Sequence, residues 1–183
     1  MKRLYYLIII FLISLVFPSD IDSAYFKYFS NPILNTGILG TWDSHSVWDS
    51  SILIENNIFR MWFTGYDGNK MQIGYSESFD PVYFTKNLNN PIINWDIIEQ
   101  NVFGVGGPSV LKVGGVYKMW FVKASSNLQA FYIYYSQSAD GISWSTPMLI
   151  SFDLNSTPWD SLSTQLAIPY VRFNNNLNVL RIS

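Results

Sequence analysis

The chain repeats itself at a nearly constant interval. The segment NPIL at Asn31–Leu34 returns as NPII at Asn90–Ile93. NNIFRMWFTG at Asn56–Gly65 returns as GGVYKMWFVK at Gly114–Lys123, and IGYSES at Ile73–Ser78 returns as IYYSQS at Ile133–Ser138. Three segments that recur in the same order and at nearly the same spacing indicate a repeated supersecondary unit.

Each unit has the pattern of β-strands. In FRMWFT (residues 59–64) side-chain type alternates with a period of two, and YKMWFV (residues 117–122) repeats the alternation. Turn-forming segments, YDGNK, KVGG and SADG, separate such runs. The first unit therefore predicts strands at residues 50–54, 59–65 and 71–78, followed by a short outer strand. Four antiparallel strands per unit are typical of a propeller blade.

A third unit begins near the end of the chain. AIPYVRFNNNLNVLRIS aligns with WDSSILIENNIFRMWFT, which puts residues 176–183 on the second strand of that unit. The predicted fold is all-β, with about two and a half four-stranded antiparallel blades at residues 31–93, 94–150 and, truncated, 151–183. A closed ring needs about four blades. We therefore expect missing blades from the rest of a longer protein or from another chain.

Residues 1–24 differ from the rest. Lys2 and Arg3 precede a largely apolar run that ends at Pro18, which predicts a signal peptide at residues 1–24 ahead of a propeller domain at residues 25–183. An uncleaved N-terminal anchor is the alternative, because Asp22 lies where a small residue is preferred near the cleavage site. We expect an exported protein, extracellular or periplasmic, with no disulfide because the chain lacks cysteine.

The amino-acid composition limits the classes of ligand and partner that we expect for this chain. The net charge is −2, only 13% of residues are charged, and no long run of like charge occurs, so we expect neither a nucleic-acid partner nor a membrane contact beyond the signal segment. A polar but weakly charged surface suits a neutral carbohydrate, either an oligosaccharide or a polysaccharide. The single histidine, His45, argues against a transition-metal site, and we expect no metal and no cofactor.

The motifs W-D, P-S-V/I, K-M-W-F, I-G-Y-S-x-S and D-G-I-x-W resemble those of the five-bladed β-propeller glycoside hydrolases. That superfamily includes arabinanases, xylosidases, invertases, levansucrases and the related β-mannoside phosphorylases, and the chain is most similar to predicted secreted glycosidase-like propellers. The resemblance covers residues 31–183. It implies three acids, one at the start of the inner strand of each of three successive blades, that converge on an axial funnel.

Of the three positions in this chain that match the family's acids, only the first holds an acid. Asp49 occupies the first acid position, where it would be a base or a fixing carboxylate. The second position is Gly107 and the third is Ile168, and neither can transfer a proton. Glycoside hydrolysis ordinarily needs two carboxyl groups across the scissile bond. Whether the chain is an enzyme therefore stays open, as does the structural alternative that Asp49 only bonds to backbone amides near its turn.

Further residues are candidates for contact with a sugar. Trp48 has no aromatic counterpart in the other units, where Gly106 and Ala167 stand, so it is the better stacking candidate. His45 is a candidate for a hydrogen bond to the sugar, and the alternative is a partly exposed loop histidine without a function. The predicted substrate-binding residues are Asp43, His45, Trp48, Gly107 and Asp160.

Other repeated residues have a structural explanation. Trp-Asp pairs recur at residues 42–43, 95–96 and 159–160, which fits a packing tryptophan and a turn aspartate in every blade. The alternative is that Asp43, Asp96, Glu99 and Asp160, which precede the inner strands, reach the mouth of the funnel and replace the missing acids, as residues of the missing blades could. Trp62 and Trp120 hold the same position and are expected to pack between blades. SADGISW at Ser138–Trp144 resembles the Asp-box turns of sialidases, which are structural.

These observations support a secreted carbohydrate-active protein that binds or cleaves a neutral glycan in the funnel. The alternatives are a non-catalytic glycan-binding propeller, which Gly107 and Ile168 favour, and a structural or protein-binding propeller without a sugar ligand.

Overall fold

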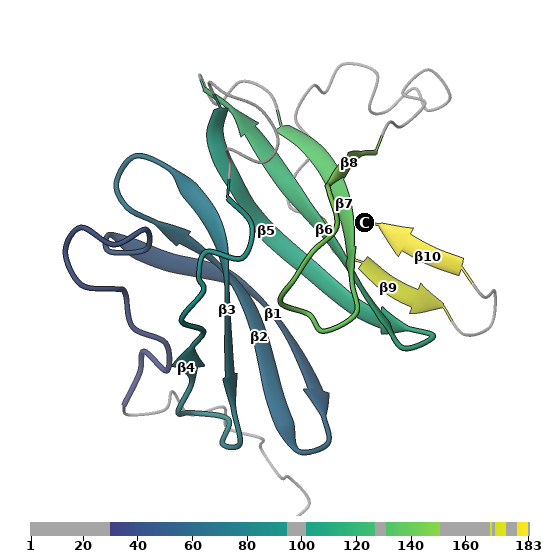
Figure 1. The fold of residues 1–183 in the computed structure, drawn as a ribbon, viewed down its shortest axis with the longest axis horizontal. Coiled ribbons are helices and arrows are strands. Elements are labelled where there is room, and N and C mark those ends of the chain that lie inside the picture. The colour runs from purple at the N-terminus through teal and green to yellow at the C-terminus, as the bar shows by residue number, and fades with distance from the viewer. Residues whose placement is uncertain are drawn as a thin grey trace, which may run out of the picture. The chain divides into compact units, whose positions relative to one another are not determined.

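The computed structural model describes residues 30–94, 102–126, 131–150, 169, 171–174 and 179–182. These residues form ten strands and no helix (Figure 1). All ten strands belong to one compact unit, Pro32–Ser183. Within the described part of the chain, no helix is long and apolar enough to cross a membrane. The predicted all-β class is confirmed.

The first blade is a four-stranded antiparallel sheet. It consists of β1 (Ser46–Glu55), β2 (Ile58–Tyr66), β3 (Met71–Ser78) and β4 (Thr85–Lys86), paired in chain order. Asn56 and Asn57 connect β1 and β2 with positive φ angles of 50° and 63°. Tight hairpins need this backbone conformation, and asparagine adopts it readily.

The second blade repeats the first. Its strands are β5 (Val102–Val113), β6 (Val116–Ser125), β7 (Phe131–Ser138) and β8 (Met148–Leu149), again antiparallel in chain order. Here Gly114 and Gly115 make the first hairpin turn, with φ angles of 60° and 83°. One parallel bridge, from Met71 to Gly104, joins the blades into a continuous sheet.

A third unit begins with the hairpin of β9 (Val171–Asn174) and β10 (Val179–Ile182), drawn in yellow in Figure 1. Strand β10 lies within the segment predicted to hold the second strand of that blade. The structure therefore has the predicted two blades and the start of a third.

The repeated Met-Trp-Phe segments explain why the blades stack. Because side chains alternate along a strand, Met61 and Phe63 face one side of β2 while Trp62 faces the other. All three are buried, as are their counterparts Met119, Trp120 and Phe121 on β6. A strand that is apolar on both faces must be covered on both. In the first blade, Ile33, Leu34, Trp42, Val47 and Phe84 cover the Met61 and Phe63 face, and the second blade covers the Trp62 face.

One face of β2 makes the contact with the second blade. Arg60, Trp62 and Thr64 share this face because they occupy every second position of the strand. The indole of Trp62 donates a 2.8 Å hydrogen bond to the carbonyl of Gly141. Trp62 also lies 5.8 Å from Tyr117, between ring centroids. The buried cluster between the blades comprises Trp62, Ile73, Tyr75, Ile93, Val105, Val110, Tyr117, Met119 and Phe121.

Trp62 therefore packs between blades, as predicted. Trp120 packs between the second blade and the third unit, because it forms a buried cluster with Ile133 of β7 and Val171 of β9.

The turn after β7 is held by Asp140. Its carboxylate accepts hydrogen bonds from the amides of Ile142 and Ser143, at 2.8 and 2.7 Å, and from the hydroxyl of Ser138 at 2.9 Å. Partial burial alone would raise the pKa of Asp140, but these hydrogen bonds outweigh it and lower that pKa to about 2. The carbonyl that accepts from Trp62 belongs to the next residue, so this turn also positions a contact between blades.

This lowered pKa predicts a contribution to acid stability. Because the pKa of Asp140 is lower in the folded state than its ordinary value, the stabilisation is complete above about pH 4 and is lost as the pH falls towards about 2. We expect Asp140→Asn to lose less free energy of unfolding across this range than the wild type, measured by urea unfolding with circular dichroism. Equal losses in the two proteins would contradict this assignment.

Candidate functional site

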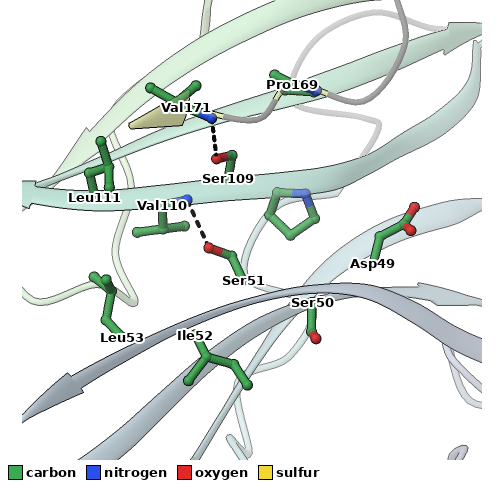
Figure 2. A pocket seen from close by; sticks show the side chains of 11 residues that line it. Asp49, Ser50, Ser51, Ile52, Leu53, Ser109, Val110, Leu111, Pro169 and Val171 are labelled. Carbon is green, nitrogen blue, oxygen red and sulfur yellow. Dashed lines mark hydrogen bonds between the residues drawn. The ribbon is translucent and has the colours of Figure 1, made fainter. Parts of the chain in front are cut away.

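The inner strands of the three units enclose a cavity of about 400 Å³ (Figure 2). Strand β1 contributes residues 49–53, β5 contributes residues 108–111, and Pro169 and Val171 come from the third unit. The cavity is therefore lined by the inner strands, the elements from which the resemblance to propeller hydrolases expects a binding site to be built.

Two serines tie these inner strands together. The hydroxyl of Ser51 accepts a 3.0 Å hydrogen bond from the amide of Val110, and the hydroxyl of Ser109 accepts one of 3.0 Å from the amide of Val171. Both bonds are drawn in Figure 2. Since the two serines hold the same position in their blades, each blade anchors the next through the same contact.

Asp49 lies at one end of this lining, on an irregular part of β1. The pairing of β1 with β2 shifts between Trp48 and Ser51, which is a β-bulge, and Asp49 has a φ of 48°. Aspartate is one of the few residues other than glycine that adopts this conformation readily. A bulge redirects a side chain that would otherwise follow the regular alternation of the strand.

The surroundings of Asp49 raise the pKa of its carboxyl. Partial burial is the main cause, and a hydrogen bond with the side chain of Trp48 acts in the opposite direction. Among the described residues that line the cavity, Asp49 carries the one ionisable side chain. The carboxylate is thus desolvated yet adjacent to open space, which suits a group that binds a ligand hydroxyl.

The second blade has the same bulge with a glycine in it. The pairing of β5 with β6 shifts between Gly106 and Ser109, and Gly107 has a φ of 60°. The amide of Gly107 donates a 2.9 Å hydrogen bond to the buried hydroxyl of Thr64 on β2. The structure therefore places Gly107 as the counterpart of Asp49, with its backbone bound to the first blade and no side chain to offer.

An aromatic cluster lies beside Asp49. The ring of Tyr66 is 5.9 Å from Trp48, 5.3 Å from His45 and 5.8 Å from Phe103 between centroids. Trp48 is 37% exposed, and His45 is exposed with its Nδ1 atom 3.0 Å from the hydroxyl of Ser46. The structure thus brings together two predicted site residues, His45 and Trp48.

Sequence reasoning missed Tyr66 and Phe103. Tyr66 pairs with Ser46 at the open end of the β1–β2 hairpin, so its place beside Trp48 follows from the hairpin register. Phe103 comes from the second blade and reaches the cluster only through the contact between blades, for which the sequence carries no local signal.

Asp43 is held differently from the other predicted site residues. It is only 2% exposed, and its carboxylate forms an ion pair with the ammonium group of Lys86 on β4. The hydroxyl of Thr41 donates to the same carboxylate at 3.2 Å. The neighbouring Trp42 packs 5.6 Å from Phe63, between ring centroids, so this Trp-Asp pair joins the start of the blade to β2 and to the outer strand β4.

The other predicted positions, Asp160, Ile168, Asp96 and Glu99, lie outside the described residues, as does the predicted signal peptide. In the described part of the chain, no group of three or more histidine, aspartate or glutamate side chains is placed to hold a metal ion.

Comparison with solved structures places this geometry in context. A putative glycoside hydrolase from Parabacteroides distasonis matches with a TM-score of 0.58 and 14% identity, over 66% of this chain and 40% of that one. A putative glycosidase from Bacteroides thetaiotaomicron matches with a TM-score of 0.56 and 17% identity, over 65% and 40%. The chain has the fold of the propeller glycoside hydrolases. The Bacillus subtilis arabinanase Arb43A also matches, with a TM-score of 0.50 and 16% identity, over 70% of this chain and 44% of the arabinanase.

Sequence comparison gives relatives without an assigned activity. Two uncharacterized proteins from Mycobacterium tuberculosis strains, MT1551 and Rv1502, are each 28% identical over an alignment of 130 residues that covers 63% of this chain. The aligned region is 41% of the length of each relative, so the propeller described here corresponds to about two fifths of those proteins. No protein-family model matches the chain.

Proposed function

We propose that this propeller binds a neutral glycan at the end of the inner-strand cavity where Asp49 lies. The observation that carries the proposal is the position of Asp49, a partly buried carboxylate on a bulge of the inner strand, next to a partly exposed tryptophan. The fold shared with glycoside hydrolases adds support.

The chemistry of the two neighbours fits a sugar. The indole of Trp48 offers a flat apolar surface to the C–H face of a pyranose or furanose ring. The carboxylate of Asp49 accepts hydrogen bonds from ring hydroxyls, and hydrogen bonds to a charged acceptor are stronger than neutral ones. The ring of Tyr66 packs edge-on against Trp48, and Phe103 packs against Tyr66 in turn.

Binding without cleavage is the form that the described residues favour. Cleavage requires a second carboxyl group opposite the first, at about 5–5.5 Å or about 6.5–9.5 Å according to mechanism. The equivalent position in the second blade is Gly107. Hydrolysis is the second candidate, with Asp49 as base and a general acid supplied from outside the described residues. Export through residues 1–24 is part of the proposal.

The test uses Asp49→Gly, which copies the second blade. Because glycine relieves the positive φ of Asp49, we expect Asp49→Gly to unfold at the same urea concentration as the wild type or slightly above. Its affinity for the ligand should fall roughly 10- to 100-fold, since a hydrogen bond to a charged group contributes about 1.5–3 kcal/mol.

The measurement is isothermal titration calorimetry with short oligosaccharides of arabinan, inulin and yeast mannan, chosen because the resemblance covers arabinanases, invertases and mannoside phosphorylases. Equal affinities of the wild type and Asp49→Gly for every oligosaccharide would exclude Asp49 from the site. Release of reducing sugar by the wild type but not by Asp49→Asn would establish hydrolysis instead of binding alone.

A further inference from the structure

Two turns on the outer part of the blades share two side-chain hydrogen bonds to the backbone. In the first blade Ser78 accepts from the amide of Asp80 at 2.9 Å, and Asp80 accepts from the amide of Val82 at 2.8 Å. In the second blade Ser138 accepts from the amide of Asp140 at 3.2 Å, and Asp140 accepts from the amide of Ile142 at 2.8 Å. The second turn therefore serves as an internal control for the first.

The two turns differ in two exposed side chains. Phe79 stands where the second blade has Ala139, and Tyr83 stands where it has Ser143. Phe79 is 82% exposed and Tyr83 is 69% exposed. Since the second blade forms the same two hydrogen bonds with alanine and serine at these positions, those bonds do not require the two aromatic rings.

The two aromatic side chains line a second cavity, of about 420 Å³. Two carboxylates, Glu77 and Asp80, share the lining with them, and both are exposed. The hydroxyl of Tyr75 donates to Glu77 at 2.8 Å, which fixes one oxygen of that carboxylate. The remaining lining residues are Ile58, Ser78 and Thr85.

This second cavity is separate from the Asp49 site. Its lining includes Ile58, the first residue of β2, and Ser78, which pairs with Phe59. The second cavity therefore lies at the start of β2. Trp48, beside Asp49, pairs with Thr64 near the opposite end of β2. A ligand beside Asp49 and Trp48 therefore lies near the opposite end of β2 from a ligand in the second cavity.

We propose that the cavity lined by Phe79, Tyr83, Glu77 and Asp80 is a second binding site, for a neutral polysaccharide chain. Aromatic faces bind the apolar faces of sugar rings, while the carboxylates accept hydrogen bonds from sugar hydroxyls. The carboxylates repel anionic ligands and are costly to bury against lipid. The ligand class follows from these four residues and does not depend on Asp49.

The test variant is the double substitution Phe79→Ala and Tyr83→Ser, which installs the side chains of the second blade. Because both side chains are exposed, we expect the urea midpoint to stay that of the wild type. In native gels that contain soluble arabinan, inulin or yeast mannan, we expect the wild type to be retarded by at least one of the three. The double variant should have an at least tenfold higher dissociation constant for that polysaccharide.

Leu88→Ala is the matched control, because Leu88 is a fully exposed apolar residue of the same blade, with 100% exposure. Leu88→Ala should leave the retardation of the protein unchanged. Asp49→Gly should weaken the binding of short oligosaccharides. It should not remove the part of polysaccharide binding that depends on the second cavity. The proposal is overturned if no polysaccharide retards the wild type, if the double variant is retarded equally, or if Leu88→Ala has the same effect.

Discussion

Replacing Trp62 by alanine is expected to lower the free energy of unfolding by about 3–5 kcal/mol, the usual range for deleting a buried aromatic side chain. Trp62 is fully buried, and it packs against Tyr75 of its own blade and Tyr117 of the next. The substitution would leave a cavity between the blades. It would also leave the carbonyl of Gly141 without its indole donor. A loss of this size is comparable to a large part of the stability of a small domain.

Urea unfolding followed by far-ultraviolet circular dichroism measures this effect, because the signal does not depend on the removed indole. Trp62→Phe retains an aromatic ring in the contact but loses the hydrogen bond to Gly141 and part of the buried volume, so its expected cost is smaller, about 1–3 kcal/mol. Trp48→Ala is the control, because Trp48 is partly exposed and should cost much less. Equal losses for Trp62→Ala and Trp48→Ala would contradict the inter-blade packing.

Replacing Gly104 by alanine is the second change with a large expected effect. Gly104 has a φ of 149°, and an added Cβ atom would lie 2.3 Å from the carbonyl oxygen of Met71 and 2.5 Å from its nitrogen. These are backbone atoms of the parallel bridge between the blades, so they cannot move aside as a flexible side chain would. We expect a loss of more than about 3 kcal/mol from backbone strain and overpacking together.

The matched control is Gly115→Ala, in the hairpin turn between β5 and β6. Gly115 also has a positive φ, of 83°, but an added Cβ atom there meets nothing within 4 Å. It should therefore cost only the backbone strain of about 1–2 kcal/mol. If the two variants lose equal stability in urea, the close contact with Met71 is not what requires glycine at position 104.

Gly104 also connects stability to the candidate site. It follows Phe103, whose ring contacts Tyr66 in the aromatic cluster. A displaced bridge would move Phe103 away from that cluster, so any folded Gly104→Ala protein should bind short oligosaccharides more weakly than Gly115→Ala does.

The strands and the blade order were predictable because their causes lie in consecutive residues. The alternation in FRMWFT and YKMWFV sets which side chains share a face, and Asn56-Asn57 and Gly114-Gly115 supply the turn conformations. The packing of Trp62 between blades followed from its recurrence as Trp120. The Asp140 turn followed from a local motif whose hydrogen bonds all lie within positions 138–143.

The candidate site was predictable only in part. Asp49 was identified because it matches the first acid position of the family that the sequence resembles, and the repeat register made the contrast with Gly107 visible. That both residues occupy β-bulges with positive φ was not visible, because a bulge depends on the register against a neighbouring strand.

By itself, the sequence determined the repeat, the four-stranded blades and the asymmetry between Asp49 and Gly107, since each of these is encoded locally or by position within a repeat. Only the tertiary structure decided that Phe103 completes the cluster at Trp48 and that Thr64 binds the amide of Gly107. These contacts join residues of different blades that lie far apart in the sequence. The physical reason is that they depend on how one blade packs against the next, and that packing is a sum over many buried side chains with no single motif to mark it.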